Sequence, residues 1–288
     1  MIGSGIVSLI QATIVPGLCS LIFFKIKPDN FFEFIAHTIV HSLLFNYMLV
    51  FLLVSIGFNY LSIHIVILGI LLTYLWIKKT ELRSLVTEAK TNILFSTTIN
   101  KSVFNTFIFL TLFAGFYIIF FDFKGVFTEW DAIVSWNRWA KEWFRGNLPK
   151  DTKYYPQGLV ANWSVTYLYM GNIDVQLFAK LINSIFPLLT SILFISWSIR
   201  DKNVYILLAI PVYYVLLLSY YQAETVINGY MDIPLAFAWL YAVYNLQKFK
   251  QSIIDFKLLL IALAFACVVK QIAFYLVIVF FVMYFWHI

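Results

Sequence analysis

The chain has 288 residues, of which 62% are hydrophobic, 20% are aromatic and only 12% are charged, with a formal net charge of +6. A soluble domain carries about twice that share of charged residues. The mean hydropathy of +0.86 excludes a soluble cytosolic enzyme, an extracellular binding module and a disordered chain. Because a membrane-spanning helix needs about 20 apolar residues, the composition predicts an integral membrane protein that crosses the bilayer many times.

Long apolar runs along the chain predict an all-α membrane protein with about nine transmembrane helices. The last two runs are divided only by Lys270 and Gln271. Cys19 and Cys267 lie within apolar runs, which indicates buried thiols and no disulfide framework. The predicted spans cover residues 2–24, 34–58, 61–77, 103–121, 176–199, 203–221, 230–247, 256–269 and 271–287.

The distribution of basic residues predicts the orientation, since Lys and Arg accumulate in cytoplasmic loops. Twelve of the 20 basic residues lie in one set of alternate loops, whereas the short loops on the other side carry only Lys270. We therefore expect the N-terminus outside and residues 78–102 in the cytoplasm, with 122–175 as an extracytoplasmic loop. The chain then divides into residues 1–102, with the first spans and the cytoplasmic loop, and a second transmembrane module over 103–288.

The extracytoplasmic loop is predicted to contain an amphipathic helix from about Glu129 to Arg145, because Thr128 precedes it as a cap and Gly146 follows it. Such a helix lies in the membrane interface. Its polar stripe consists of Asp131, Ser135, Arg138, Glu142 and Arg145, opposite a face rich in tryptophan. The apolar stretch Leu159–Met170 is short for a span and predicts a second interfacial or re-entrant helix.

Three elements of the second module resemble the GT-C superfamily of polytopic membrane glycosyltransferases, including the protein O-mannosyltransferase-like and aminoarabinose-transferase-like bacterial members. The run EWDA at residues 129–132, continuing to Trp139-Ala140-Lys141, is similar to their first outer loop. Tyr154-Tyr155-Pro156 stands where that loop leads into the next span. The segment from Glu224 to Asp232 is similar to a later acidic element, and Lys270 to a lysine at the outer end of a helix pair.

The resemblance implies transfer of a sugar from a polyprenyl-phosphate donor to a glycan, lipid or protein acceptor, with inversion. It implies a multi-pass protein of the cell membrane with its site on the extracytoplasmic side, and no nucleic-acid partner. Asp131 is then the catalytic carboxylate, with Glu129 beside it as a substitute or as a second ligand to a divalent metal. The substrate-binding residues implied are Arg138, Lys141, Tyr155, Glu224, Asp232 and Lys270.

A structural reading remains open for each of these residues. Asp131 can serve as a helix cap with Thr128, Glu129 as a surface acid, and Lys270 as a lysine that extends to the headgroups. Arg138 and Lys141 can be solvated rim charges. His37, His41 and His64 are predicted to serve helix packing, because no carboxylate is expected on their face to complete a metal site.

Three other functions compete with glycosyl transfer. A polymerase or ligase of lipid-linked oligosaccharides shares the polytopic form but typically has an arginine-rich outer loop, whereas this loop is nearly balanced in charge. A transporter or lipid flippase predicts polar groups and broken helices near the bilayer midplane. A non-catalytic membrane scaffold predicts that the acidic residues of the loop are freely replaceable.

Overall fold

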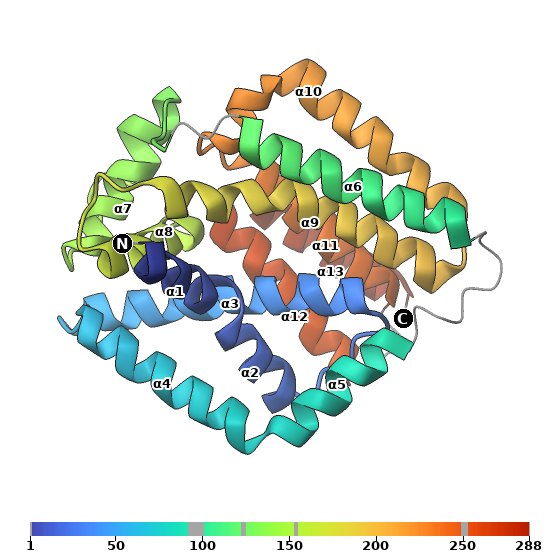
Figure 1. The fold of residues 1–288 in the computed structure, drawn as a ribbon, viewed down its shortest axis with the longest axis horizontal. Helices are drawn as coiled ribbons and strands as arrows, with labels where there is room; N and C mark the ends of the chain where they lie inside the picture. Colours follow the sequence, from blue (N-terminus) through green and yellow to red (C-terminus); the bar gives the residue numbers. More distant parts are fainter. Residues whose placement is uncertain (1, 92–100, 122–124, 153–154, 249–252, 288) are drawn as a thin grey trace.

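A computed structural model describes residues 2–91, 101–121, 125–152, 155–248 and 253–287, and every regular element in this part of the chain is a helix (Figure 1). Helix α9 runs through the bundle between α3 and α6, with α4 and α5 along one edge and α10 along the other. The elements are α1 (Ile2–Thr13), α2 (Val15–Phe23), α3 (Phe31–Ser55), α4 (Leu61–Ile77), α5 (Lys79–Thr91), α6 (Lys101–Phe121), the π-helix η1 (Ala132–Trp136), α7 (Asn137–Phe144), α8 (Gly158–Met170), α9 (Leu177–Asp201), the 3-10 helix η2 (Val204–Leu208), α10 (Ala209–Ile227), α11 (Asp232–Lys248), α12 (Ile253–Val269) and α13 (Ala273–His287).

Each of the nine predicted apolar runs forms helix, mostly with ends within about three residues of those expected. In the described part of the chain, three helices are long and apolar enough to cross a membrane, namely Ile2–Phe23, Phe31–Ser55 and Leu177–Asp201. A fourth is added if Leu61–Ile77 and Lys79–Lys90, which meet at a bend of 75°, count as one span. The architecture is therefore compatible with an all-α membrane protein, and a crossing by all nine stays a proposal.

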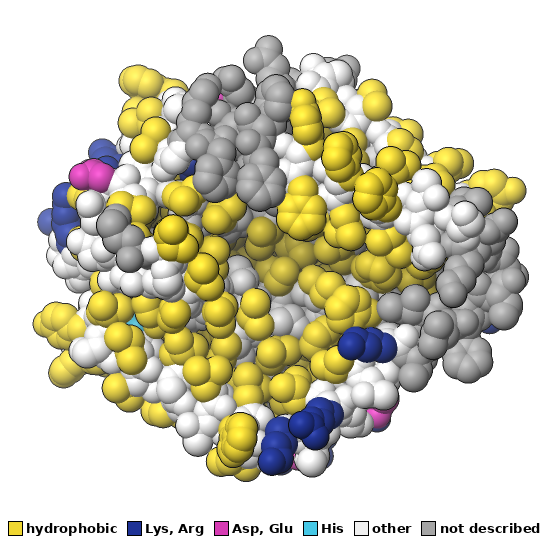
Figure 2. All heavy atoms as spheres, in the orientation of Figure 1, with side chains coloured by type: hydrophobic (Ala, Val, Ile, Leu, Met, Phe, Trp, Pro, Cys, Tyr) yellow, Lys and Arg dark blue, Asp and Glu magenta, His cyan; other side chains and the backbone are white. Residues whose placement is uncertain are grey.

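Large apolar side chains cover much of the surface. Figure 2 shows them spread across one face over most of the helices. Phe109 and Phe113 on α6 and Trp76 on α4 are among them, each more than 60% exposed. A soluble protein rarely exposes a contiguous apolar surface of this extent, whereas lipid tails cover it without cost.

The first predicted span has one irregular residue, Ile14 (φ −126°, ψ −64°), between α1 and α2, and Pro16 lies in the first turn that follows. A polar chain inside the bundle lies beside the end of α1. The amide of Gln11 donates to His64 Nδ1 at 2.9 Å and accepts from the Tyr169 hydroxyl at 2.5 Å. His64 Nε2 in turn donates to Asn59 Oδ1 at 3.0 Å, so its role is to join helices, as predicted.

Helix α8 lies inside the bundle, where residues 158–169 are all buried. It contacts α1, α3, α7, α9 and α12. The close approach to α12 requires Gly158, since a Cβ there would lie 2.6 Å from the carbonyl oxygen of Val268. The segment expected as an interfacial or re-entrant helix is therefore packed among other helices on all sides. Its interior place agrees with the re-entrant alternative, because 13 residues are too few to cross a bilayer.

Candidate functional site

The predicted amphipathic helix is present but begins with a π-turn. The helix starts at Trp130, continues as η1 and α7, and ends at Gly146 with φ +76°. Its Trp136, Trp139 and Trp143 are buried against the bundle, whereas Arg138 is exposed. The amphipathic pattern expected from the sequence is thus confirmed. The π-turn was not expected, and such turns occur frequently at functional sites.

Asp131 does not act as a cap. It stands immediately before η1 with helical dihedral angles, its side chain makes no capping hydrogen bond, and it is exposed. The alternative role of Asp131, as a helix cap together with Thr128, is therefore not observed. Its carboxylate is exposed at the first turn of the helix.

The second acidic element lies directly against this turn. Gly229 adopts φ +102°, a conformation that L-residues rarely adopt, and an added Cβ would lie 2.7 Å from Cβ of Ala132. The same Cβ would lie 3.0 Å from Cδ1 of Phe127. Two segments far apart in the chain, 127–132 and 228–232, are therefore joined by a glycine contact.

Tyr230, the residue after this glycine, lies among the carboxylates of both segments. Desolvation raises the pKa of its phenol, followed by the nearby negative charges of Glu129 and Asp131. A hydrogen bond to Glu129 and the charge of Asp232 act in the same direction. The hydroxyl therefore stays protonated at neutral pH, with the carboxylates of Glu129, Asp131 and Asp232 near it.

Asp232, the first residue of α11, forms an ion pair with Lys270, which follows the end of α12. Oδ1 and Nζ lie 2.6 Å apart, and the two side chains are 43% and 25% exposed. Three carboxylates predicted to belong to the site thus lie near one unpredicted tyrosine, and the predicted Lys270 pairs with one of them. We call this set the loop cluster: Glu129, Asp131, Tyr230, Asp232 and Lys270.

Side chains at the N-terminal end of α9 form hydrogen bonds to the backbone of the two segments that carry the loop cluster. The buried Lys180 donates from Nζ to the carbonyl oxygen of Val126 at 3.0 Å. Asn183 donates to the carbonyl oxygen of Tyr230 at 3.3 Å, and the side chain of Gln176 accepts from the Phe127 amide at 2.8 Å. Lys180 was missed, although an ionisable residue within a predicted apolar span is a recognisable signal.

The other predicted site residues are not joined to the loop cluster. Among the described residues, no hydrogen bond or ion pair links Arg138 or Lys141 to it, and Arg138 is exposed. The ring of Tyr155 packs against Trp136 and Trp139, with centroids 5.4 and 6.0 Å away, so it covers the tryptophans of the loop helix. The side chain of Glu224 lies outside the described part of the chain.

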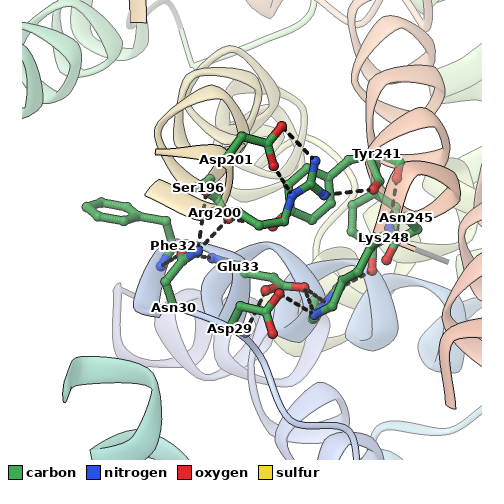
Figure 3. Close-up of polar contacts among 12 residues, drawn as sticks. Asp29, Asn30, Phe32, Glu33, Ser196, Arg200, Asp201, Tyr241, Asn245 and Lys248 are labelled. Carbon is green, nitrogen blue, oxygen red and sulfur yellow. Dashed lines mark hydrogen bonds and ion pairs between the residues drawn. The ribbon is translucent and has the colours of Figure 1, made fainter. Parts of the chain in front are cut away.

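A second cluster, which sequence reasoning missed, lies at the opposite ends of these helices, with Glu33, His37 and Tyr241 buried and Asp29 partly exposed (Figure 3). Glu33, fully buried, accepts from Lys248 Nζ at 2.7 Å and from His37 Nε2 at 2.9 Å. The other ring nitrogen of His37, Nδ1, forms a hydrogen bond with the Tyr241 hydroxyl at 2.5 Å. Lys248 also contacts Asp29 at 3.0 Å. We call Asp29, Glu33, His37, Tyr241 and Lys248 the buried cluster.

The buried cluster corrects one sequence expectation. A carboxylate does join the histidine face, since Glu33 lies one helical turn before His37 on α3. His41, one turn further, binds Ser20 of α2 through Nδ1 at 2.8 Å. The three histidines therefore join helices, as predicted, and His37 does so through a charged partner.

A polar cleft of about 620 Å³ opens beside the buried cluster. Arg200 of α9 lies on one side, where it pairs with Asp201 at 2.7 Å and stands 4.4 Å over the ring of Tyr244. Its Nη1 donates to the carbonyl oxygen of Tyr244 at 3.2 Å. Asn30, which caps α3, donates to Ser196 Oγ at 3.0 Å. These contacts tie α3, α9 and α11 together (Figure 3).

No group of three or more His, Cys, Asp or Glu side chains suited to hold a metal ion is found within the described residues. The carboxylates of the loop cluster stand beside a lysine and a phenol instead. Comparisons of the chain with protein-family models, with curated proteins and with solved structures gave no match.

Proposed function

We propose that the chain is an integral membrane glycosyltransferase of the GT-C kind, which transfers a sugar from a polyprenyl-phosphate donor to an acceptor on the extracytoplasmic side of the cell membrane. One observation gives this proposal its main support. Carboxylates from two distant segments, 129–131 and 232, lie around the hydroxyl of Tyr230 with a lysine on one of them. The residue order and types resemble the outer loops of that superfamily.

In this proposal Asp131 orients the acceptor and takes its proton, because its carboxylate is exposed and is not used for capping. The acceptor oxygen attacks the anomeric carbon, the bond from that carbon to the phosphate oxygen breaks, and the electron pair leaves on the polyprenyl phosphate. A single displacement of this type inverts the configuration. Tyr230 holds Glu129 in place beside the acceptor.

Lys270 is the proposed contact of the donor phosphate. Its ion pair with Asp232 is partly exposed to solvent, and such pairs contribute about 1 kcal/mol or less. A phosphate group therefore exchanges with Asp232 at little cost, which leaves Asp232 free to bind sugar or acceptor. Arg138 and Lys141, on the loop helix, are proposed as further phosphate contacts, and Glu224 as a sugar or acceptor contact.

The test is release of free polyprenyl phosphate by the purified full-length protein from a panel of polyprenyl-phosphate sugars, with glycan, lipid and peptide acceptors supplied. Asp131→Asn is compared with Asp151→Asn, an exposed aspartate of the same loop at φ +58°, where asparagine is also tolerated. We expect loss of release in the first variant only. A product with retained anomeric configuration contradicts the displacement, and equal release by both variants removes Asp131 from the site.

A second candidate function, a proton-coupled transporter, is favoured by the buried cluster. Ionisable residues inside a membrane bundle commonly mark ion or proton paths. This candidate predicts proton uptake by proteoliposomes that is abolished in Glu33→Gln and unaffected in Asp131→Asn. The transferase predicts the reverse dependence for polyprenyl-phosphate release. A ligase of lipid-linked oligosaccharides is distinguished by its release of a polyprenyl diphosphate.

A further inference from the structure

A pocket outside both clusters lies where the end of α2 meets the bend between α4 and α5. It has a volume of about 640 Å³. Leu21, Ile22 and Leu85 form its apolar lining, and all three are buried. The lysines Lys25, Lys27 and Lys78 line the pocket as well. Thr80, Glu81, Ser84 and Glu88 complete the lining. Apolar side chains and lysines in one pocket fit a molecule with an acyl end and an anionic end.

The lysines of this pocket are available to an anion. Lys27 pairs with Glu88 at 3.2 Å and Lys78 with Glu81 at 2.6 Å, and all four side chains are 40% or more exposed. Because exposed pairs contribute at most about 1 kcal/mol, a phosphate replaces either carboxylate easily. Lys25 has no carboxylate partner among the described residues, so the three lysines and two glutamates leave the pocket with a positive charge.

The backbone at Lys25 is held in a costly conformation. Its φ is +55°, in the left-handed region where glycine usually closes a helix. The amide of Lys25 donates to Ile22 and that of Ile26 to Leu21, which closes the end of α2 around this residue. A lysine in place of glycine costs about 1 kcal/mol here, and its position brings the side chain to the pocket.

The surroundings of the pocket are those of a water–lipid boundary. Phe23 and Trp76 are each 70% or more exposed, and Lys79 Nζ lies 5.0 Å from the Trp76 ring centroid. Tryptophan and lysine together are typical of the headgroup layer. Figure 2 shows basic side chains gathered over the α4–α5 bend next to a continuous hydrophobic surface.

We propose that this pocket binds an anionic phospholipid, with its phosphate on Lys25, Lys27 and Lys78 and its proximal acyl carbons against Leu21, Ile22 and Leu85. The observations favour a lipid over free phosphate because the pocket has apolar as well as basic lining residues, and because Phe23 and Trp76 beside it are exposed. They favour an anionic lipid over a zwitterionic one because the pocket carries excess positive charge.

The test measures lipid retained by the purified full-length protein, by native mass spectrometry, after incorporation into nanodiscs of phosphatidylcholine containing a minor fraction of phosphatidylglycerol. Lys25→Gln/Lys27→Gln is expected to weaken phosphatidylglycerol binding about fivefold for each lysine removed. The matched control is Lys202→Gln/Lys150→Gln. Lys202 also ends a helix, α9, at φ +51°, but it does not line this pocket. The control is expected to bind as the wild type does.

A variant that is expected to strengthen lipid binding separates the proposed effect from a loss of binding caused by misfolding. Glu81→Gln removes a carboxylate that competes for Lys78, so we expect tighter phosphatidylglycerol binding than in the wild type. The proposal is overturned if phosphatidylcholine is retained equally, if the control pair weakens binding as much as the pocket pair, or if Glu81→Gln weakens it. Equal affinity for inorganic phosphate in detergent would also overturn the assignment to a lipid.

Discussion

The contact between Gly229 and Ala132 holds the two halves of the loop cluster together, and Gly229→Ala perturbs it directly. The added Cβ would lie 2.7 Å from Cβ of Ala132, closer than real Cβ contacts, so one segment has to move. Overpacking of this kind costs about 1–3 kcal/mol. The positive φ of +102° adds about 1–2 kcal/mol for a residue with a Cβ. We therefore expect a destabilisation of roughly 2–5 kcal/mol.

The control is Gly57→Ala, at φ +74°, where an added Cβ has no atom within 4 Å. It carries the backbone cost alone, about 1–2 kcal/mol. The assay is the apparent Tm of the protein purified in detergent, which falls by about 2–4 °C per kcal/mol in a chain of this size. The packing of the two loops as described is refuted if Gly229→Ala lowers Tm no more than Gly57→Ala does.

Two further predictions concern single side chains of the clusters. Lys248→Met removes a cation from the fully buried Glu33 and is expected to lower the free energy of unfolding in urea by about 3–5 kcal/mol. The control Arg145→Met breaks the exposed pair with Glu142 and is expected to lower it by less than about 1 kcal/mol. Similar losses in both variants would show that Glu33 is not buried as described. Tyr230→Phe removes the hydrogen bond to Glu129 and is expected to slow release of polyprenyl phosphate about tenfold or more. The control Tyr205→Phe, at an exposed position of η2, is expected to retain the wild-type rate. An unchanged rate in Tyr230→Phe would exclude a role for this hydroxyl.

Much of the helical architecture could be predicted from the sequence. In an apolar membrane environment the backbone N–H and C=O groups have no water to bond, and a helix satisfies them within one segment. Residues 61–77 were predicted and observed with the same ends, and 256–269 begins three residues earlier, at Ile253. The irregular turn at Ile14 was missed, although Pro16 and Gly17 follow it and are a readable signal for a helix interruption. The interior place of α8 was also missed, since burial on all sides depends on five neighbouring helices.

The candidate site followed only in part. Glu129, Asp131, Asp232 and Lys270 were named from their types and order, and the structure places them together. Tyr230 carried no signal, because the chain holds 18 tyrosines and only the turn at Gly229 distinguishes this one. In the buried cluster, the spacing of Glu33 and His37 was readable as one turn of helix. Their link to Lys248 was not, since it joins helices more than 200 positions apart.

The most direct test of the central claim asks whether two distant loops form one site that faces the outside of the cell. In a chain with Cys19→Ala and Cys267→Ala, the pair Glu129→Cys and Tyr230→Cys is treated in intact cells with a short bifunctional thiol reagent that does not cross the membrane. We predict an intramolecular cross-link in intact cells, and none when Tyr205→Cys replaces Tyr230→Cys. A cross-link that forms only after permeabilisation would contradict the outward orientation. No cross-link under either condition would contradict the loop cluster itself.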